Sequence, residues 1–224
     1  MKTCNTSSTQ STGTIIHRNF AQYVTVDEEG VKDFLKAIAV NGVGQAITLE
    51  ALGITVKAMI MPNMTREARC MLVLPKGAWV NNLKWMHNEN RRQAHFLEMT
   101  CWKISGAVAE FFFDEYDYYG NLGLGDIEGS YDYLSAYESS HNIRHDRVLA
   151  GCTVVVEQLL SKHREVAEAM MDHLSKQGNL SELEIGRYLV GVRKDELGKQ
   201  VLAVFQEPWL EDEAERVQRM FIGS

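Results

Sequence analysis

The sequence lacks closely spaced cysteine pairs and long apolar runs, and each absence excludes a class of protein. The chain has 224 residues and four cysteines, none of them in a CxxC pair. This argues against a zinc ribbon or a disulfide-stapled scaffold and favours reduced thiols. Since no run of about 18 apolar residues is present, no segment is expected to span a membrane. The N-terminus is polar, unlike a secretory signal, so we expect a soluble cytoplasmic protein.

Lysine and arginine are absent from residues 104–143, although the whole chain contains 23 of them. The same stretch holds eight acids, so its charge alone accounts for the net charge of −7. Nine aromatic residues are interleaved with these acids. A block of one charge sign is typical of an interaction surface or an ion site, rather than of a general device for solubility.

The pattern of apolar residues along the chain predicts an α+β fold with a mainly helical C-terminal part. With 45% hydrophobic residues, the chain can bury a core. We expect a flexible tail over residues 1–13, a small mixed α/β portion over 14–85 and a mainly helical portion over 86–224. The mixed portion should pack on the helical portion as one globular unit.

The N-terminal third alternates between strand and helix patterns. Residues 15–26 are rich in β-branched and aromatic side chains, typical of one or two short strands. A helical pattern follows, which Asp27 can cap and which Gly42 and Gly44 are expected to end. A further strand should end at Pro62, and another should precede the next turn.

Apolar residues at helical spacing fill most of the C-terminal two thirds. Gly178 stands where the C-terminal cap of one such helix is expected. Ser181 and Glu184 form the capping-box pattern that begins the next helix. The expected helices cover residues 89–113, 152–177 and 182–192, and a last helix begins at Pro208.

We interpret the acidic, tyrosine-rich block as a surface that binds a partner. Carboxylates on a folded surface can imitate nucleic-acid phosphates, and tyrosines are frequent interface anchors. The expected function is non-enzymatic binding of a basic protein, without a cofactor; inhibition of a nucleic-acid-binding enzyme by mimicry is one form of it. Alternatively, Phe111 to Phe113 and half of the tyrosines are core, and the acids are an ordinary solvated rim. The predicted partner-binding residues are Asp114, Glu115, Tyr116, Asp117, Tyr118, Tyr119, Asp126, Glu128 and Asp132.

A second hypothesis places one divalent metal ion on Glu138, His141 and His145. In one continuous helix these residues fall at i, i+3 and i+7, within an arc of about 60° that suits ligation of one ion. Such an ion could activate water, as in a metal-dependent hydrolase. Histidines at this spacing are also common on solvated helix faces, so the pattern is a loose one.

A third hypothesis is a helix-turn-helix with Asn142 at the turn. The string from Asn142 to Leu149, NIRHDRVL, resembles the turn and recognition helix of the Rha family of phage regulators, over about fifteen residues. The resemblance implies a DNA-binding regulator in which Arg144 and Arg147 face the groove. Glu138 departs from the family pattern, which has a small residue there. A turn at Asn142 would also break the single face that the metal hypothesis needs.

Two other kinds of site are disfavoured by the sequence. The glycine-rich stretch 120–129 has no GK[S/T] motif and carries Asp126 and Glu128 instead of a cation, which argues against nucleotide binding. The three cysteines beyond the N-terminal tail lie in apolar surroundings, which is typical of buried, inert thiols.

Overall fold

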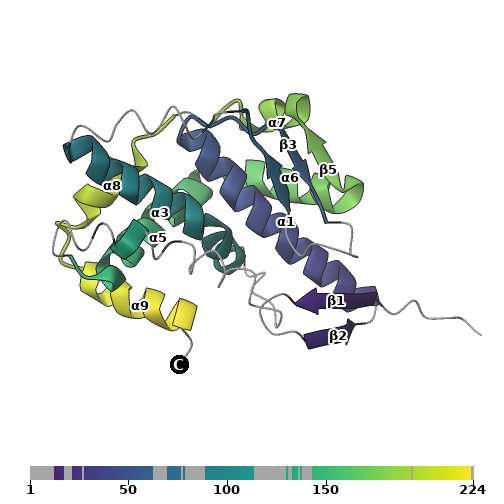
Figure 1. Ribbon diagram of the computed structural model, residues 1–224, viewed down its shortest axis with the longest axis horizontal. Coiled ribbons are helices and arrows are strands. Elements are labelled where there is room, and N and C mark those ends of the chain that lie inside the picture. Colours follow the sequence, from purple (N-terminus) through teal and green to yellow (C-terminus); the bar gives the residue numbers. More distant parts are fainter. Residues whose placement is uncertain are drawn as a thin grey trace, which may run out of the picture.

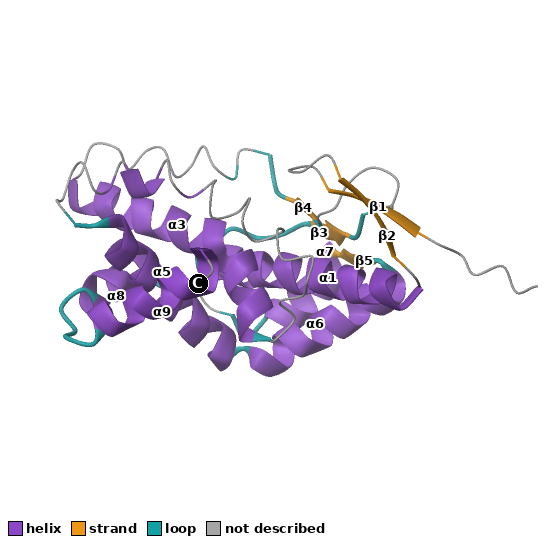
Figure 2. Cartoon of the chain, turned by 90° about the horizontal axis from the view of Figure 1, so that it is seen from below, coloured by secondary structure: helices purple, strands orange, loops and turns teal. Residues whose placement is uncertain are grey.

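The α+β class is confirmed, with helices forming most of the described chain and short strands gathered at one end (Figures 1 and 2). The expected tail lies outside the described residues, except for Gly13, which begins the first strand. The computed structural model describes residues 13–17, 22–26, 28–62, 70–76, 78, 89–113, 130, 133–135, 137, 143–192 and 194–222.

The helical body is arranged around one buried helix, α5. The helices are α1 (Glu28–Ala51), α3 (Glu89–Phe112), α5 (His145–Lys162), α6 (Arg164–Gln177), α7 (Glu182–Leu189), α8 (Leu197–Val204) and α9 (Leu210–Ile222). Helix α5 contacts α1, α3, α6, α8 and α9, and every residue from Val148 to Val156 is buried. One continuous core cluster extends from Ala39 to Phe221, so it draws on both the expected mixed portion and the expected helical portion.

The expected end of the first helix at Gly42 and Gly44 is wrong, because α1 continues to Ala51. Both glycines lie where another segment approaches α1 closely. A Cβ at Gly44 would stand 2.5 Å from the backbone oxygen of Ser105 in α3, and one at Gly42 would stand 2.6 Å from Cβ of Cys70. The glycines therefore let neighbouring segments pack closely against α1, and they do not end the helix.

The single helix expected over residues 152–177 is two helices, α5 and α6. They meet at His163, whose backbone (φ −117°, ψ 25°) leaves the helical region. The His163 side chain is buried. The break redirects the chain, so that α6 packs on α1 while α5 stays in the centre of the body. Gly178 caps α6 in the left-handed conformation (φ 76°), as predicted.

The strands form two small antiparallel sheets. Where one or two short strands were expected over residues 15–26, two strands, β1 (Gly13–His17) and β2 (Gln22–Val26), pair antiparallel. The other sheet has the order β4-β3-β5, in which β5 was not predicted. Its register places Met59 opposite both Leu72 and Leu180. The strands are β3 (Ala58–Ile60), β4 (Met71–Val73) and β5 (Asn179–Ser181).

Replacing Gly44 with alanine should lower the free energy of unfolding by about 1–3 kcal/mol, because the added Cβ meets backbone rather than a side chain that can rotate away. Gly186→Ala in α7 is the matched control, because nothing lies within 4 Å of its added Cβ. It should gain about 0.5–1 kcal/mol from helix propensity. Urea unfolding of both variants in dilute solution measures the two changes, and changes of the same sign would contradict the packing role of Gly44.

Candidate interaction surfaces

The nine predicted partner-binding residues lie outside the described residues: Asp114, Glu115, Tyr116, Asp117, Tyr118, Tyr119, Asp126, Glu128 and Asp132. The described residues on either side of them belong to the folded body. Glu110 is buried and accepts a hydrogen bond of 2.6 Å from the side chain of Asn41. Ser130, which lies between Glu128 and Asp132 in the sequence, is buried, and Leu134 and Tyr137 on the C-terminal side are buried as well. Burial raises the pKa of Tyr137 to about 12.

The phenylalanines at the C-terminal end of α3 are half-buried and packed against the body. Phe111 meets Phe221 of α9 edge-on, with ring centroids 5.6 Å apart. The guanidinium of Arg164, the first residue of α6, lies 4.6 Å from the ring centroid of Phe112 and 5.3 Å from that of Phe113. These phenylalanines therefore attach the end of α3 to the neighbouring helices, a role that sequence bias alone did not distinguish from partner binding.

The metal hypothesis is not tested by the structure, because Glu138 and His141 lie outside the described residues. His145 is the half-buried first residue of α5. Within the part of the chain that is described, no three His, Cys, Asp or Glu side chains are grouped to hold an ion.

The two arginines of the DNA-binding hypothesis make ion pairs within the chain. Arg144 is exposed and pairs with Asp146. Arg147 bonds Glu211 at 2.5 Å and the backbone oxygen of Phe205 at 3.3 Å, which ties the start of α5 to α9 and to the end of α8. The rest of α5 is largely buried, so the described part of this helix lends no support to insertion into a DNA groove.

Cys101 and Cys152 are buried, as expected, whereas Cys70 is half-buried. Burial raises the pKa of the Cys70 thiol to about 12 and that of Cys152 well above its ordinary value. Since the thiolate is the reactive form, neither side chain is suited to nucleophilic catalysis near neutral pH.

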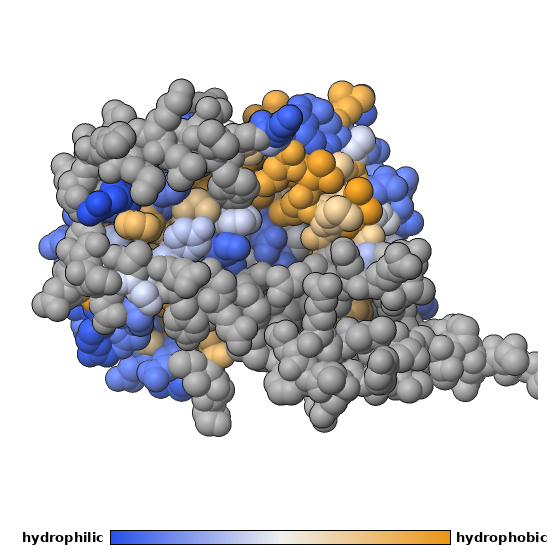
Figure 3. Space-filling model, in the orientation of Figure 1, coloured by the Kyte–Doolittle hydropathy of each residue, from blue (hydrophilic) through white to orange (hydrophobic). Residues whose placement is uncertain are grey.

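The outer face of the three-stranded sheet is an apolar surface that the sequence analysis did not identify. Met59, Leu72 and Leu180 point inward, so the alternating residues of β3 and β4 point outward. Ile60, Met71 and Val73 are 39%, 48% and 37% exposed. Figure 3 shows apolar side chains gathered where Figure 1 places these strands. Contiguous exposed apolar side chains are typical of binding surfaces.

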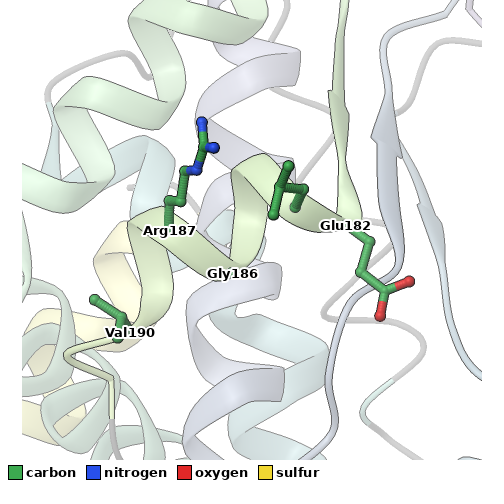
Figure 4. Close-up of a pocket in the computed structure, with 5 residues that line it drawn as sticks. Glu182, Gly186, Arg187 and Val190 are labelled. Atoms are coloured by element: carbon green, nitrogen blue, oxygen red, sulfur yellow. The ribbon is translucent and has the colours of Figure 1, made fainter.

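A second surface lies on the outer side of α7 and forms a shallow groove. We call Glu182, Leu183, Gly186, Arg187 and Val190 the α7 outer face. Leu183 is 65% exposed and Val190 is 83% exposed. Leucine and valine side chains are usually buried in a folded domain, so this exposure is unusual. Figure 4 shows Glu182 and Arg187 pointing to opposite sides of the helix.

Helix α7 is held firmly against the body from its other side. Ile185 and Leu189 are buried in the core. The predicted capping box is confirmed: the side chain of Ser181 accepts from the backbone of Glu184, whose carboxylate accepts from the Ser181 backbone at 2.8 Å. A ring nitrogen of His173 in α6 lies 3.1 Å from the Tyr188 hydroxyl. This contact between α6 and α7 could not be predicted from the sequence, because the histidine shares no motif spacing with α7.

Comparison with known proteins gives no family for this chain. The chain matches no family model, and no curated protein is significantly similar to it. No helix in the described residues is both long enough and apolar enough to cross a bilayer. Arguments about function therefore rest on the chain's own residues.

The capping box predicts a specific pH dependence. The hydrogen bonds that Glu184 accepts from the Ser181 side chain and backbone hold the pKa of this carboxyl below its ordinary value. A carboxyl whose pKa is lowered by folding contributes stability that is complete above its unfolded-state pKa. This contribution is lost as the pH falls through its folded-state pKa. Glu184→Gln should therefore reduce stability near pH 6 and make little difference at about pH 2.

Urea unfolding of this variant and the wild type across that pH range measures the difference. Glu165→Gln, an exposed substitution on α6, controls for the loss of one negative charge. A Glu184→Gln penalty that stays the same size down to the lowest pH would show that the carboxylate does not stabilise α7 in this way.

Proposed function

We propose that the protein is a non-enzymatic binding protein that engages a basic partner through residues 114–132, which we call the acidic segment. The observation that carries the proposal is the segregation of charge in the sequence. Residues 104–143 hold eight acids and no lysine or arginine, while the chain as a whole has a net charge of −7. A partner whose own function is to bind nucleic acid fits this charge, since its site already accepts closely spaced anions.

The positions of the flanking residues support this proposal. Phe113 packs beneath Arg164 before the acidic segment, and Leu134 and Tyr137 are buried after it. The segment is therefore joined at both ends to the core. Attachment at two ends restricts the conformations of a chain segment, which reduces the entropy that binding must overcome.

The ion pairs of the helical body also support the proposal. Many described cations are already matched by acids of the body: Arg147 pairs with Glu211, and Arg216 forms a two-pronged pair with Glu157. These cations are therefore already engaged by acids of the helical body. An external cationic surface could then provide the complementary charge, and such contacts mainly raise the association rate and depend on salt.

The test compares two triple variants that have the same net charge. Asp114→Asn/Glu115→Gln/Asp117→Asn neutralises the acidic segment, whereas Glu165→Gln/Glu207→Gln/Asp212→Asn neutralises exposed acids of the helical body. Each protein is immobilised and exposed to nuclease-treated lysate and, separately, to purified oligolysine as a defined cationic probe. We expect the wild type and the body variant to retain a basic nucleic-acid-binding protein at low salt and to release it at high salt.

The acidic-segment variant should lose most of this retention, and should bind oligolysine more weakly than the body variant does. Circular dichroism of both variants checks that the fold is unchanged. Equal retention by the two variants would mean that the acids are an ordinary solvated rim, and an empty capture by the wild type would also count against the proposal.

A further inference from the structure

The α7 outer face has the pattern of one heptad of a two-stranded coiled coil. Leu183, Gly186 and Val190 are spaced by three and four residues, as are the a, d and a positions of such a helix. Glu182 immediately precedes the first of them and Arg187 immediately follows the second. These are the g and e positions, which flank an apolar stripe on opposite sides, and Figure 4 shows the two charged side chains diverging in this way.

The two charges identify which kind of helix would complement this face. In a parallel pair of helices, a residue at g of one chain lies beside the residue at the following e of the other chain, five positions later. Glu182 and Arg187 are five positions apart and opposite in charge. A second copy of the same helix would therefore place the glutamate of each chain beside the arginine of the other. An antiparallel copy would place like charges on the same flank.

We propose that α7 pairs in parallel with α7 of a second copy of this chain, forming a homodimer. Leu183 and Val190 lose their exposure against their counterparts, while Gly186 contributes no side chain between them. The patch is one heptad long, so the association is weak and depends on concentration.

The surroundings of α7 prepare it for this role. Glu182 already pairs with Lys57 at the start of β3, which holds its carboxylate near the edge of the α7 outer face. A carboxylate has enough acceptor sites for Lys57 and for an arginine of the partner. Burial of Ile185 and Leu189 on the opposite side fixes the helix in the free chain. Pairing therefore requires no refolding, which limits its entropic cost.

Charge reversal across the proposed interface is the principal test. In Arg187→Glu, position 187 of each chain opposes Glu182 of the other, and in Glu182→Arg both flanks are positive. Each variant alone should sediment as a monomer at concentrations where the wild type forms dimers. An equimolar mixture should regain dimers, because each interface then joins one all-acidic helix to one all-basic helix. Analytical ultracentrifugation over a concentration series measures all four samples.

A wild type that stays monomeric at every concentration would overturn the proposal and leave the face to a helix of a different protein. Variants that dimerise like the wild type, or a mixture that gains nothing over its components, would overturn it as well. Both positions are exposed, so the fold should survive, and circular dichroism checks this. Leu183→Ser against Trp209→Ser compares loss of an exposed apolar side chain on α7 with the same loss near the start of α9; only the former should weaken the dimer.

Gly186→Leu provides a second test, with an opposite sign. Leucine at d, with aliphatic residues at a, is the usual composition of a parallel two-stranded pair. Because no atom lies within 4 Å of a Cβ at this position, the side chain should not disturb the free chain. We expect at least a several-fold tighter dimer, which the same sedimentation series measures. A monomeric Gly186→Leu chain of unchanged fold would contradict parallel pairing.

Discussion

Complete burial of the middle of α5 is the constraint on which the rest of the helical body depends. Nine consecutive residues, from Val148 to Val156, are buried, so the helix is covered on all sides over more than two turns. Covering it requires α3, α8 and α9 around it, and α1 and α6 beside it. Gly151 shows how close this packing is, because a Cβ there would stand 2.8 Å from the ring of Phe205. A helix used in this way has little free surface for a ligand.

Because α5 is buried, surfaces that could bind a ligand are expected at the edge of the body. At the N-terminus of α5, Arg144 pairs with Asp146 of the helix itself and Arg147 pairs with Glu211 of α9, so both arginines contribute to the structure without any ligand. The exposed apolar side chains lie mainly on the small sheet and on α7 instead. Both elements are anchored through one face and leave the other open. This is the usual arrangement of an interaction surface on a rigid scaffold.

Local signals in the sequence predicted the elements that depend on local chemistry. Gly178 and the pair Ser181 and Glu184 marked helix ends correctly, because caps are made by the residues next to them. The predicted helix end at Gly44 and the predicted continuous helix through His163 were wrong, since both depend on tertiary packing: of α1 on α3, and of α6 on α1. β5 could not be foreseen for the same reason: three residues become a strand only through their pairing with β3. Tertiary contacts determine all three.

The α7 outer face could not be predicted from the sequence for a different reason. Ile185 and Leu189 face the core while Leu183 and Val190 face solvent, so the apolar residues of this helix do not form one stripe. Periodicity alone cannot tell which of two apolar faces is buried. Only the packing of α7 against β5 and α6 shows which face is buried. Glu182 and Arg187 are then seen to flank the exposed face, which their spacing in the sequence did not indicate.

The acidic segment and the α7 outer face are proposed to bind through different interactions, so the two proposed roles do not compete. Attraction between the acidic segment and a cationic partner acts over about a Debye length and weakens with salt. Pairing of α7 depends chiefly on short-range apolar contact, with one ion pair on each flank. A dimer would carry two acidic segments, so a partner with an extended basic surface would be held at two points. Such a partner would bind the dimer more tightly than one segment binds alone, because the second contact forms within the complex. Weak self-association would then control the strength of partner binding through the concentration of the protein.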